Sequence, residues 1–213
     1  MTNKKSVTDV VFILDRSGSM QGTEKDTIGG YNSYINDFKD KDAKITTVLF
    51  DDKYEMITKR QEVKEVSKLT EKQYYVRGCT ALLDAVGNTI KFMEKEKAKK
   101  VIFIITTDGY ENASVEFNKS QIKEMIQAHK EWEFIYIGAD IDSYGEGESI
   151  GINSSNIANY KKDGKGISKL FKAMFVASED FCEFGQVKSL WKESLNDYME
   201  ENKSTSNESN VEW

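Results

Sequence analysis

Two uninterrupted apolar runs, residues 10–14 and 101–105, constrain the fold of this chain more than any other feature. Five consecutive large apolar residues, several of them β-branched, are typical of a strand buried on both faces of a parallel sheet. The first run stops at Asp15-Arg16-Ser17-Gly18-Ser19 and the second at Thr106-Thr107-Asp108-Gly109. Because ligands bind at the carboxyl ends of strands in open α/β sheets, these oxygen-bearing ends are candidates for a functional site.

Length and charge limit the classes of protein to consider. A chain of 213 residues is long enough for one well-packed α/β domain. The net charge of −6 and the lack of a basic block argue against a nucleic-acid partner and against an anionic membrane. No apolar stretch approaches transmembrane length, and the run behind the N-terminus is too short for a signal peptide. Cys79 and Cys182 form no disulfide framework, so we expect a cytoplasmic protein.

Hydrophobic periodicity gives the order of the remaining elements. Further strands are predicted over 45–50, 54–58 and 134–137, with a weak one near Ile157. Apolar residues at helical spacing predict helices over 24–40, from Gly78 to about 94, over 118–131, over 167–181 and over 187–198. Residues 62–77 have no clear pattern, and the Gly-rich segment 145–151 is interpreted as a connection.

This order predicts an α/β fold with a doubly wound, Rossmann-like and mostly parallel sheet, with helices on both faces. The short turn before 54–58 permits only an antiparallel hairpin, so that strand is expected at one edge. Strand 101–105 most simply lies beside strand 10–14, and the gap between them is the topological switch point. We expect a folded domain over 1–185, a C-terminal amphipathic helix over 186–200 and a disordered acidic tail over 201–213.

Five oxygen-bearing residues are expected to meet at that switch point: Asp15, Ser17, Ser19, Thr80 and Asp108. Hard oxygen ligands converging on one point suit Mg²⁺, with Mn²⁺ or Ca²⁺ as alternatives. Three neutral hydroxyls and only two carboxylates leave positive charge on a divalent ion and an open coordination position. A carboxylate supplied by another molecule is the natural complement of such a site.

Each of these residues also has a purely structural interpretation. The Asp/Ser turn at 15–19 can cap the helix that follows it. Thr80 can be a helix N-cap, and Asp108-Gly109 can be a simple turn after a strand. Independent turn residues, however, would not need to gather at the strand ends that flank one switch point. The joint pattern therefore favours a metal site.

Asp15-Arg16-Ser17-Gly18-Ser19, Thr80 and Asp108 together resemble the metal-ion-dependent adhesion site of von Willebrand factor type A domains. The resemblance covers roughly residues 8–160. It implies that Ser17, Ser19 and Thr80 coordinate Mg²⁺ by hydroxyl, directly or through water, and that Asp15 and Asp108 act largely through water. It also implies that an Asp or Glu of a protein partner completes the coordination. The chain resembles a stand-alone intracellular member of this family from a bacterium or phage. We expect it not to be an enzyme.

Other residues near the motif have open interpretations. Asp84 lies one turn beyond Thr80 and is either an outer hydrogen-bond acceptor of the site or a solvated helix acid. Glu111 and Asn112 flank the Asp108 loop and either shape it or touch a partner. Arg16 either steers the partner's carboxylate or is exposed to solvent. His129 is interpreted as a packed or boundary residue.

Two function classes follow from the same residues. The first is a Mg²⁺-dependent protein-interaction module with no chemistry of its own, whose oligomeric state is left open. The alternative is a metal-dependent phosphohydrolase with Asp15 as nucleophile. That reaction requires a second carboxylate two residues on, where this chain has Ser17, and a lysine that clamps phosphate, which the sequence does not reveal.

Overall fold

Six strands form one sheet in this computed structural model, which describes residues 7–208. The strands are β1 (Thr8–Asp15), β2 (Ala43–Phe50), β3 (Tyr54–Glu62), β4 (Lys100–Thr107), β5 (Glu133–Gly138) and β6 (Ile157–Asn159). They lie in the order β3-β2-β1-β4-β5-β6. All neighbours are parallel except β2 and β3, which are antiparallel. The predicted mostly parallel sheet with one antiparallel edge strand is confirmed.

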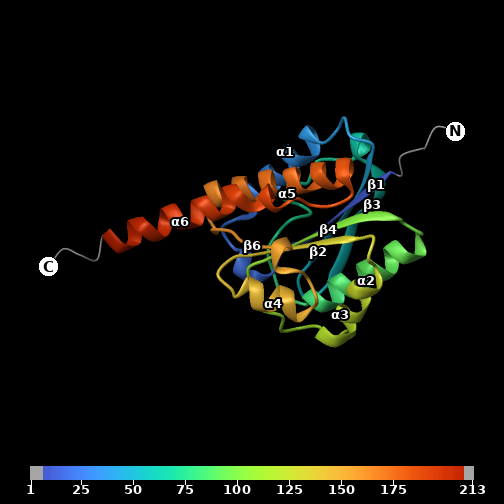
Figure 1. Cartoon of the computed structure of the whole chain (residues 1–213). Helices are drawn as coiled ribbons and strands as arrows, with labels where there is room; N and C mark the ends of the chain where they lie inside the picture. Colours follow the sequence, from blue (N-terminus) through green and yellow to red (C-terminus); the bar gives the residue numbers. More distant parts are fainter. Residues whose placement is uncertain (1–6, 209–213) are drawn as a thin grey trace.

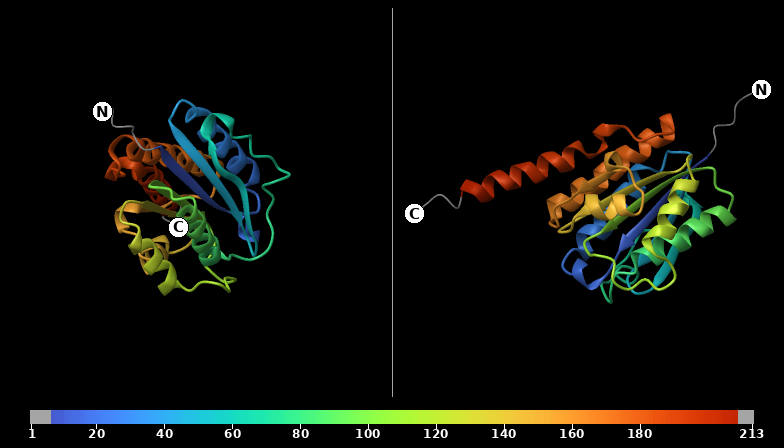
Figure 2. Two further views of the ribbon diagram at one scale, coloured as in Figure 1. Left: turned by 90° about the vertical axis from the view of Figure 1, so that its right-hand side faces the viewer. Right: turned by 60° about the horizontal axis from the view of Figure 1, so that its bottom comes forward.

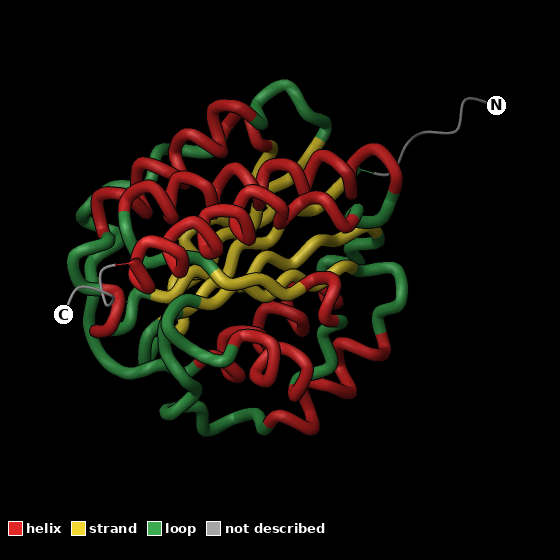
Figure 3. Tube along the Cα trace, turned by 60° about the vertical axis from the view of Figure 1, so that its left-hand side comes forward, coloured by secondary structure: helices red, strands yellow, loops and turns green. Residues whose placement is uncertain are grey.

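Helices cover both faces of the sheet (Figure 1). One face carries α1 (Glu24–Asp37), α5 (Gly164–Phe184) and, beside α5, α6 (Glu193–Glu208). The other carries α2 (Leu82–Lys95), α3 (Lys119–Ala128) and α4 (Ser143–Ser149). Figure 3 shows the strands as the middle layer between these two groups of helices. Among the helices of residues 7–208, none combines the length and the apolar character that crossing a bilayer requires.

The composition of β1 follows from its place in the middle layer. Successive side chains of a strand point to opposite faces, so both faces of a central strand must be apolar. Phe12 and Leu14 pack in the cluster that contains Tyr31 and Phe171 of the α1/α5 layer. Val11 and Ile13 pack in the cluster under α2 and α3. This double burial explains why residues 10–14 are apolar without interruption.

The switch point lies where it was predicted, between β1 and β4. Leu14 pairs with Thr106 of β4, and Asp15 pairs with Phe50 of β2, so the three strands end at the same level. The chain leaves β1 towards α1 and β2 on one side, while β4 continues to β5 on the other. The loops after β1 and β4 therefore diverge, and the position between them at this edge of the sheet, called the crevice below, is where open α/β sheets bind ligands.

The Gly-rich segment 145–151 was wrongly interpreted as a connection, because most of it belongs to helix α4. Asp142 caps this helix by accepting a hydrogen bond from the Gly145 amide at 3.0 Å. Gly147 lies so close to β6 that an added Cβ would be 2.7 Å from Ile157 Cδ1. Gly147 therefore serves close helix–strand packing, which a pattern of residue types alone does not distinguish from a flexible loop.

Segment 62–77, for which no element was predicted, contains a short 3-10 turn, Val63–Glu65, and then crosses the edge of the sheet without regular structure. Val66, Leu69 and Tyr74 nevertheless lie in the core cluster of the α1/α5 layer. The segment is thus anchored by single buried side chains, which produce no periodic signal.

The C-terminal region also differs from the prediction. A 3-10 turn, Ser189–Lys192, leads into α6, which continues through Glu208 beyond the predicted helix end at residue 200. Figure 2 shows α6 running along the body and then past it. Trp191 and Leu195 are buried in the main core cluster, so the first turns are anchored. Adding helical residues to an anchored start costs little, which explains a helix in polar residues 201–208. Residues 209–213 of the predicted tail lie outside the described residues.

Candidate metal centre

Asp15 lies at the bottom of the crevice with its carboxylate turned inward. The residue is 1% exposed. Its Oδ1 accepts a hydrogen bond from the Ser17 amide at 2.6 Å, and its Oδ2 accepts one from the Thr107 hydroxyl at 2.6 Å. Burial raises the pKa of the Asp15 carboxyl to about 6, although these hydrogen bonds oppose the shift. Asp15 therefore organises the loop from below.

The two serines of the loop connect β1 with β4 through their hydroxyls. Ser17 Oγ lies 3.1 Å from Ser19 Oγ. Ser19 Oγ donates to Asp108 Oδ1 at 2.5 Å. Because Asp108 follows β4 directly, these contacts close the crevice with a continuous chain of oxygen atoms. Three of the five predicted residues are thus brought into direct contact.

Thr80 reaches the same place from the turn before α2. The N-cap of α2 is Ala81 and not Thr80, so the structural interpretation of Thr80 as the cap is wrong. A Cβ added to Gly109 would lie 2.9 Å from Thr80 Oγ1 and 3.5 Å from Ser19 Oγ. Both hydroxyls therefore face the small space over Gly109, which only the absence of a side chain keeps open.

The donor set fits a small, hard divalent ion. The Ser19 and Thr80 hydroxyls face the space over Gly109. The Ser17 hydroxyl and the Asp108 carboxylate contact the Ser19 hydroxyl, and Asp15 accepts a hydrogen bond from the Ser17 amide. Within residues 7–208 no group of three or more His, Cys, Asp or Glu side chains is arranged to hold a metal. The candidate centre therefore depends on hydroxyl oxygens, which suit Mg²⁺ and Mn²⁺ better than thiophilic ions.

Asp84 fixes the loop that carries Asp108, and neither predicted role describes it. Its Oδ2 accepts from the Val115 amide at 2.8 Å, and its Oδ1 accepts from the amides of Glu116 and Phe117, both at 2.9 Å. The residue is 9% exposed, so it is not a solvated helix acid. Three amide donors on one buried carboxylate tie the loop after β4 to α2.

Glu111 and Asn112 take the first of their two predicted roles, since they shape the loop. Glu111 accepts hydrogen bonds from the amides of Leu83 and Ala113, both at 2.9 Å. Asn112 Oδ1 accepts from the Thr80 amide at 2.9 Å, and its own amide donates to the Thr80 carbonyl at 3.0 Å. The position of Thr80 is therefore set by the loop that follows Asp108.

Arg16 was wrongly predicted to face a partner or solvent, because the structure buries it completely. Its Nε lies 2.8 Å from Asp51 Oδ2 and its Nη2 lies 2.8 Å from Glu55 Oε2. The guanidinium also stacks over the Tyr75 ring at 5.4 Å from the centroid. Arg16 therefore points away from the crevice and joins the β1 loop to the start of β3.

Lys162 is a residue of the centre that the sequence analysis missed. It lies between β6 and α5, and its Nζ is 3.0 Å from Asp108 Oδ2. Asp140, which follows β5, lies 3.6 Å from the same ammonium. Burial lowers the pKa of Lys162, but its contacts with Asp108 outweigh that effect and raise it. The order of strands β4, β5 and β6 was a signal, because it places the loops after all three at one edge.

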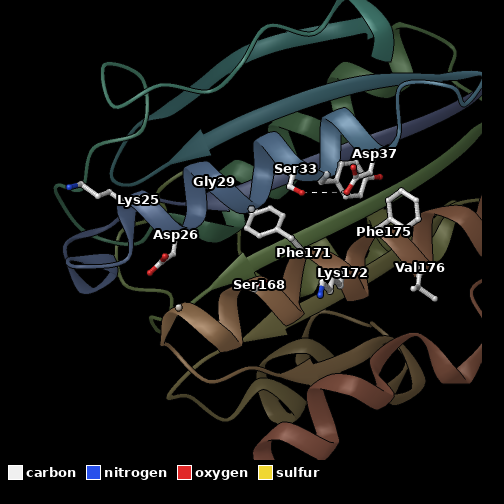
Figure 4. Close-up of a pocket in the computed structure, with 13 residues that line it drawn as sticks. Lys25, Asp26, Gly29, Ser33, Asp37, Ser168, Phe171, Lys172, Phe175 and Val176 are labelled. Carbon is white, nitrogen blue, oxygen red and sulfur yellow. Dashed lines mark hydrogen bonds between the residues drawn. The ribbon is translucent and has the colours of Figure 1, made fainter.

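A groove between α1 and α5 is separate from this centre (Figure 4). It has a volume of about 530 Å³, and Phe171 and Phe175 lie along it between charged residues such as Asp26 and Lys172. An added Cβ on Gly30 would lie 2.1 Å from the Phe171 ring, so this glycine lets the two helices approach. None of the five predicted metal ligands lines the groove.

Comparisons with solved structures define the fold. A von Willebrand factor type A protein from Catenulispora acidiphila superposes with a TM-score of 0.59 at 16% identity, over 82% of this chain and 43% of that one. Proximal thread matrix protein 1 from the mussel byssus, with zinc in its MIDAS motif, superposes with a TM-score of 0.58 at 16% identity, over 80% of this chain and 45% of that one. A variant of the PilB minor pilin from Streptococcus sanguinis superposes with a TM-score of 0.63 at 11% identity, over 89% of this chain and 63% of that one.

These likenesses show that the chain has a von Willebrand factor type A-like fold. At identities of 11–16% they show the fold alone. The chain spans 43–63% of the lengths of these solved chains. No family model and no curated protein matches the sequence.

Proposed function

We propose that this protein is a metal-ion-dependent protein-interaction module of the MIDAS type. Ser17, Ser19 and Thr80 would hold Mg²⁺ by their hydroxyls, with Asp15 and Asp108 behind them. The observation that carries the proposal is a chain of contacts from Ser17 through Ser19 to Asp108, together with the Ser19 and Thr80 hydroxyls that face the bare Cα of Gly109. A dication bound there supplies Lewis acidity that the two carboxylates leave partly unsatisfied.

The partner is proposed to present an Asp or Glu side chain to the metal. Three of the five ligands are neutral hydroxyls and the two carboxylates lie behind them, so a bound dication keeps Lewis acidity and an open position that suits a carboxylate ligand. Tyr110 follows Gly109 in the chain and is 52% exposed. An exposed aromatic ring beside a charged centre is the kind of side chain that anchors protein interfaces. The rim of the centre therefore supports recognition of a protein.

Calorimetric titration with Mg²⁺ and Mn²⁺ tests the metal proposal. Thr80→Ala removes one hydroxyl ligand without changing any charge, so we expect metal affinity to fall by about tenfold or more. Thr89→Ala is the matched control, because Thr89 is buried in α2 and its hydroxyl donates to the Ala85 carbonyl at 2.6 Å. Equal affinities in both variants would contradict the assignment of Thr80.

Partner capture is tested with the immobilised protein. We expect a bound protein to be released by EDTA and to be absent with Thr80→Ala, while Thr89→Ala keeps it. The captured protein is then mutated at its exposed acidic residues, and one Asp or Glu is expected to dominate the affinity. Capture that survives EDTA undiminished would mean that recognition uses another surface.

A metal-dependent phosphohydrolase is the second candidate, and Lys162 is the observation that favours it. This ammonium supplies a cation beside Asp108 that a phosphate group would require. Two observations weigh against the reaction. Ser17 still occupies the position of the general acid/base, and both oxygens of Asp15 accept hydrogen bonds, one from the Ser17 amide and one from the Thr107 hydroxyl of β4. Release of phosphate from generic monoesters with Mg²⁺ would favour this candidate over the interaction module.

A further inference from the structure

The ammonium of Lys162 lies at the edge of the candidate metal centre. Its Nζ is 3.0 Å from Asp108 Oδ2, 3.3 Å from the Ser19 carbonyl oxygen and 3.6 Å from Asp140 Oδ2. Asp108 and Ser19 are both among the residues proposed to hold the metal. A protein-borne cation thus already contacts the Asp108 carboxylate, which a divalent ion would use, and the backbone of Ser19, whose hydroxyl is a proposed ligand.

Asp108 has little capacity to serve two cations at once. Its side chain is fully buried, so water does not screen its charge. Its Oδ1 is already engaged by the Ser19 hydroxyl at 2.5 Å, which leaves Oδ2 to the Lys162 ammonium. Two cations within a few ångströms of one buried carboxylate repel each other strongly. The positive charge of Lys162 therefore weakens the binding of a metal ion in the centre.

Lys162 has a path away from Asp108. The Lys162 side chain is 26% exposed, whereas that of Asp140 is 69% exposed. The ammonium can therefore move outward from Asp108 while it keeps Asp140 or gains water. A long, flexible lysine side chain makes such a movement without any change in the backbone.

We propose that Lys162 is a tethered cation that competes with the divalent ion for Asp108 and keeps the metal affinity of the centre low. This inference rests on the metal site proposed above and adds its regulation. Binding of the ion displaces the ammonium from Asp108, and displacement of the ammonium strengthens binding of the ion. An acidic partner that pairs with Lys162 raises the metal affinity, because it removes the competitor.

Lys161 provides a matched control for the charge of Lys162. It is the preceding residue and carries the same charge, but its Nζ contacts Asn202 Oδ1 at 2.6 Å and Asp163 Oδ2 at 3.4 Å. Lys161→Met therefore changes the net charge of the protein as Lys162→Met does, without altering the contacts of Asp108. Lys162→Arg keeps a cation at position 162.

Titration with Mn²⁺, followed by the electron paramagnetic resonance signal of the free ion, tests the proposal. We expect Lys162→Met to bind Mn²⁺ about tenfold more tightly than the wild type, or better. Lys161→Met should differ from the wild type by less than about twofold, because the Lys161 ammonium is partly exposed and contacts Asn202 and Asp163 and not Asp108. Lys162→Arg should retain the weak affinity. Unchanged or weaker binding by Lys162→Met overturns the proposal.

The outcomes separate this proposal from the proposed function. If the wild type and Lys162→Met bind Mn²⁺ equally, the metal site stands and competition by Lys162 fails. If only Lys162→Met binds, both stand. If neither variant nor wild type binds, the metal site itself fails, and the competition fails with it.

A second measurement follows the ammonium directly. Lysines are labelled by reductive ¹³C-methylation, which keeps their charge, and the Lys162 resonance is assigned by its loss in Lys162→Met. We expect saturating Mg²⁺ to shift the Lys162 resonance and to leave that of Lys161 in place. A Lys162 resonance that does not move at saturation overturns the proposal.

Discussion

Thr107 donates its hydroxyl hydrogen to Asp15 across the junction of β4 and β1, with 2.6 Å between Thr107 Oγ1 and Asp15 Oδ2. The two residues are 92 positions apart, so the bond joins the two strands whose ends form the crevice. It also orients the carboxylate so that its other oxygen accepts from the Ser17 amide. The shape of the β1 loop therefore depends on β4.

Thr107→Val should loosen this loop. The replacement keeps the shape of the side chain but leaves Asp15 Oδ2 buried without its partner, which costs about 1–3 kcal/mol of unfolding free energy. We expect lower stability in urea and weaker Mg²⁺ binding. Thr106→Val is the control, because the neighbouring Thr106 does not contact Asp15. Equal losses in both variants would mean that the bond to Asp15 has no special weight.

Gly109→Ala should block the metal centre and leave the fold intact. The new methyl group would lie 2.9 Å from Thr80 Oγ1 and 3.5 Å from Ser19 Oγ, in the space where the hydroxyls meet. We expect Mg²⁺ binding in calorimetry to be lost, with a change in stability of no more than about 1 kcal/mol. Gly29→Ala is the control, since an added Cβ there meets nothing within 4 Å. Full metal affinity in Gly109→Ala would place the ion elsewhere.

Asp84→Ala should release the loop that carries Asp108. Three backbone amides would lose their shared acceptor, and we expect the free energy of unfolding to fall by about 2–3 kcal/mol. Hydrogen exchange should accelerate at residues 115–117 and metal affinity should fall. Asn88→Ala, one turn further along α2, removes only an exposed contact with Glu116 and should cost less than about 0.5 kcal/mol. Unchanged exchange in Asp84→Ala would contradict this role.

Asp51 should make stability depend on pH in the acid range. Burial raises its pKa, but hydrogen bonds from Arg77 and Lys53 and the charge of Arg16 outweigh this and lower it below 3.8. The contribution of Asp51 is therefore complete above about pH 4 and is lost as the pH falls through the lower folded-state pKa. At pH 7, Asp51→Asn should lower the free energy of unfolding by up to about 3 kcal/mol, because buried Arg16 then keeps only the half-exposed Glu55 as a charge partner.

Urea unfolding between pH 7 and pH 2 measures this effect. The difference between Asp51→Asn and the wild type should shrink as the pH falls below about 4, since the wild-type carboxyl is then protonated as well. Asp40→Asn is the control, because Asp40 is an exposed aspartate in the connection between α1 and β2. A constant difference across the whole range would show that ionisation of Asp51 does not contribute.

The sheet and its switch point were predictable because they depend on local patterns. The apolar runs 10–14 and 101–105 and the short turn at 51–53 were enough to predict two central strands and an antiparallel edge. Helix ends were less predictable. Glycine in α4 packs against β6, and the anchoring of α6 by Trp191 comes from contacts far away in the sequence.

The site was predictable only where the type of a residue indicates its chemical role. Hydroxyl and carboxylate residues at strand ends indicated the five candidate ligands, and the structure brings these positions together. The roles of Arg16, Asp84 and Lys162 depend on partners 35, 31–33 and 54 residues away. Charged residues are usually solvated, so nothing in the local sequence distinguishes these three from surface residues. Their assignment required the tertiary contacts.

The candidate centre is assembled from segments that the ribosome delivers at widely separated times. A nascent chain that has emerged as far as β3 contains Asp15, Ser17 and Ser19 but lacks Thr80 and Asp108. The complete set of five exists only once 108 of the 213 residues have been made and β4 has paired with β1. A growing chain that ends before β4 therefore lacks part of the proposed metal centre. A bound metal ion would thus indicate that β4 has been made and has paired with β1.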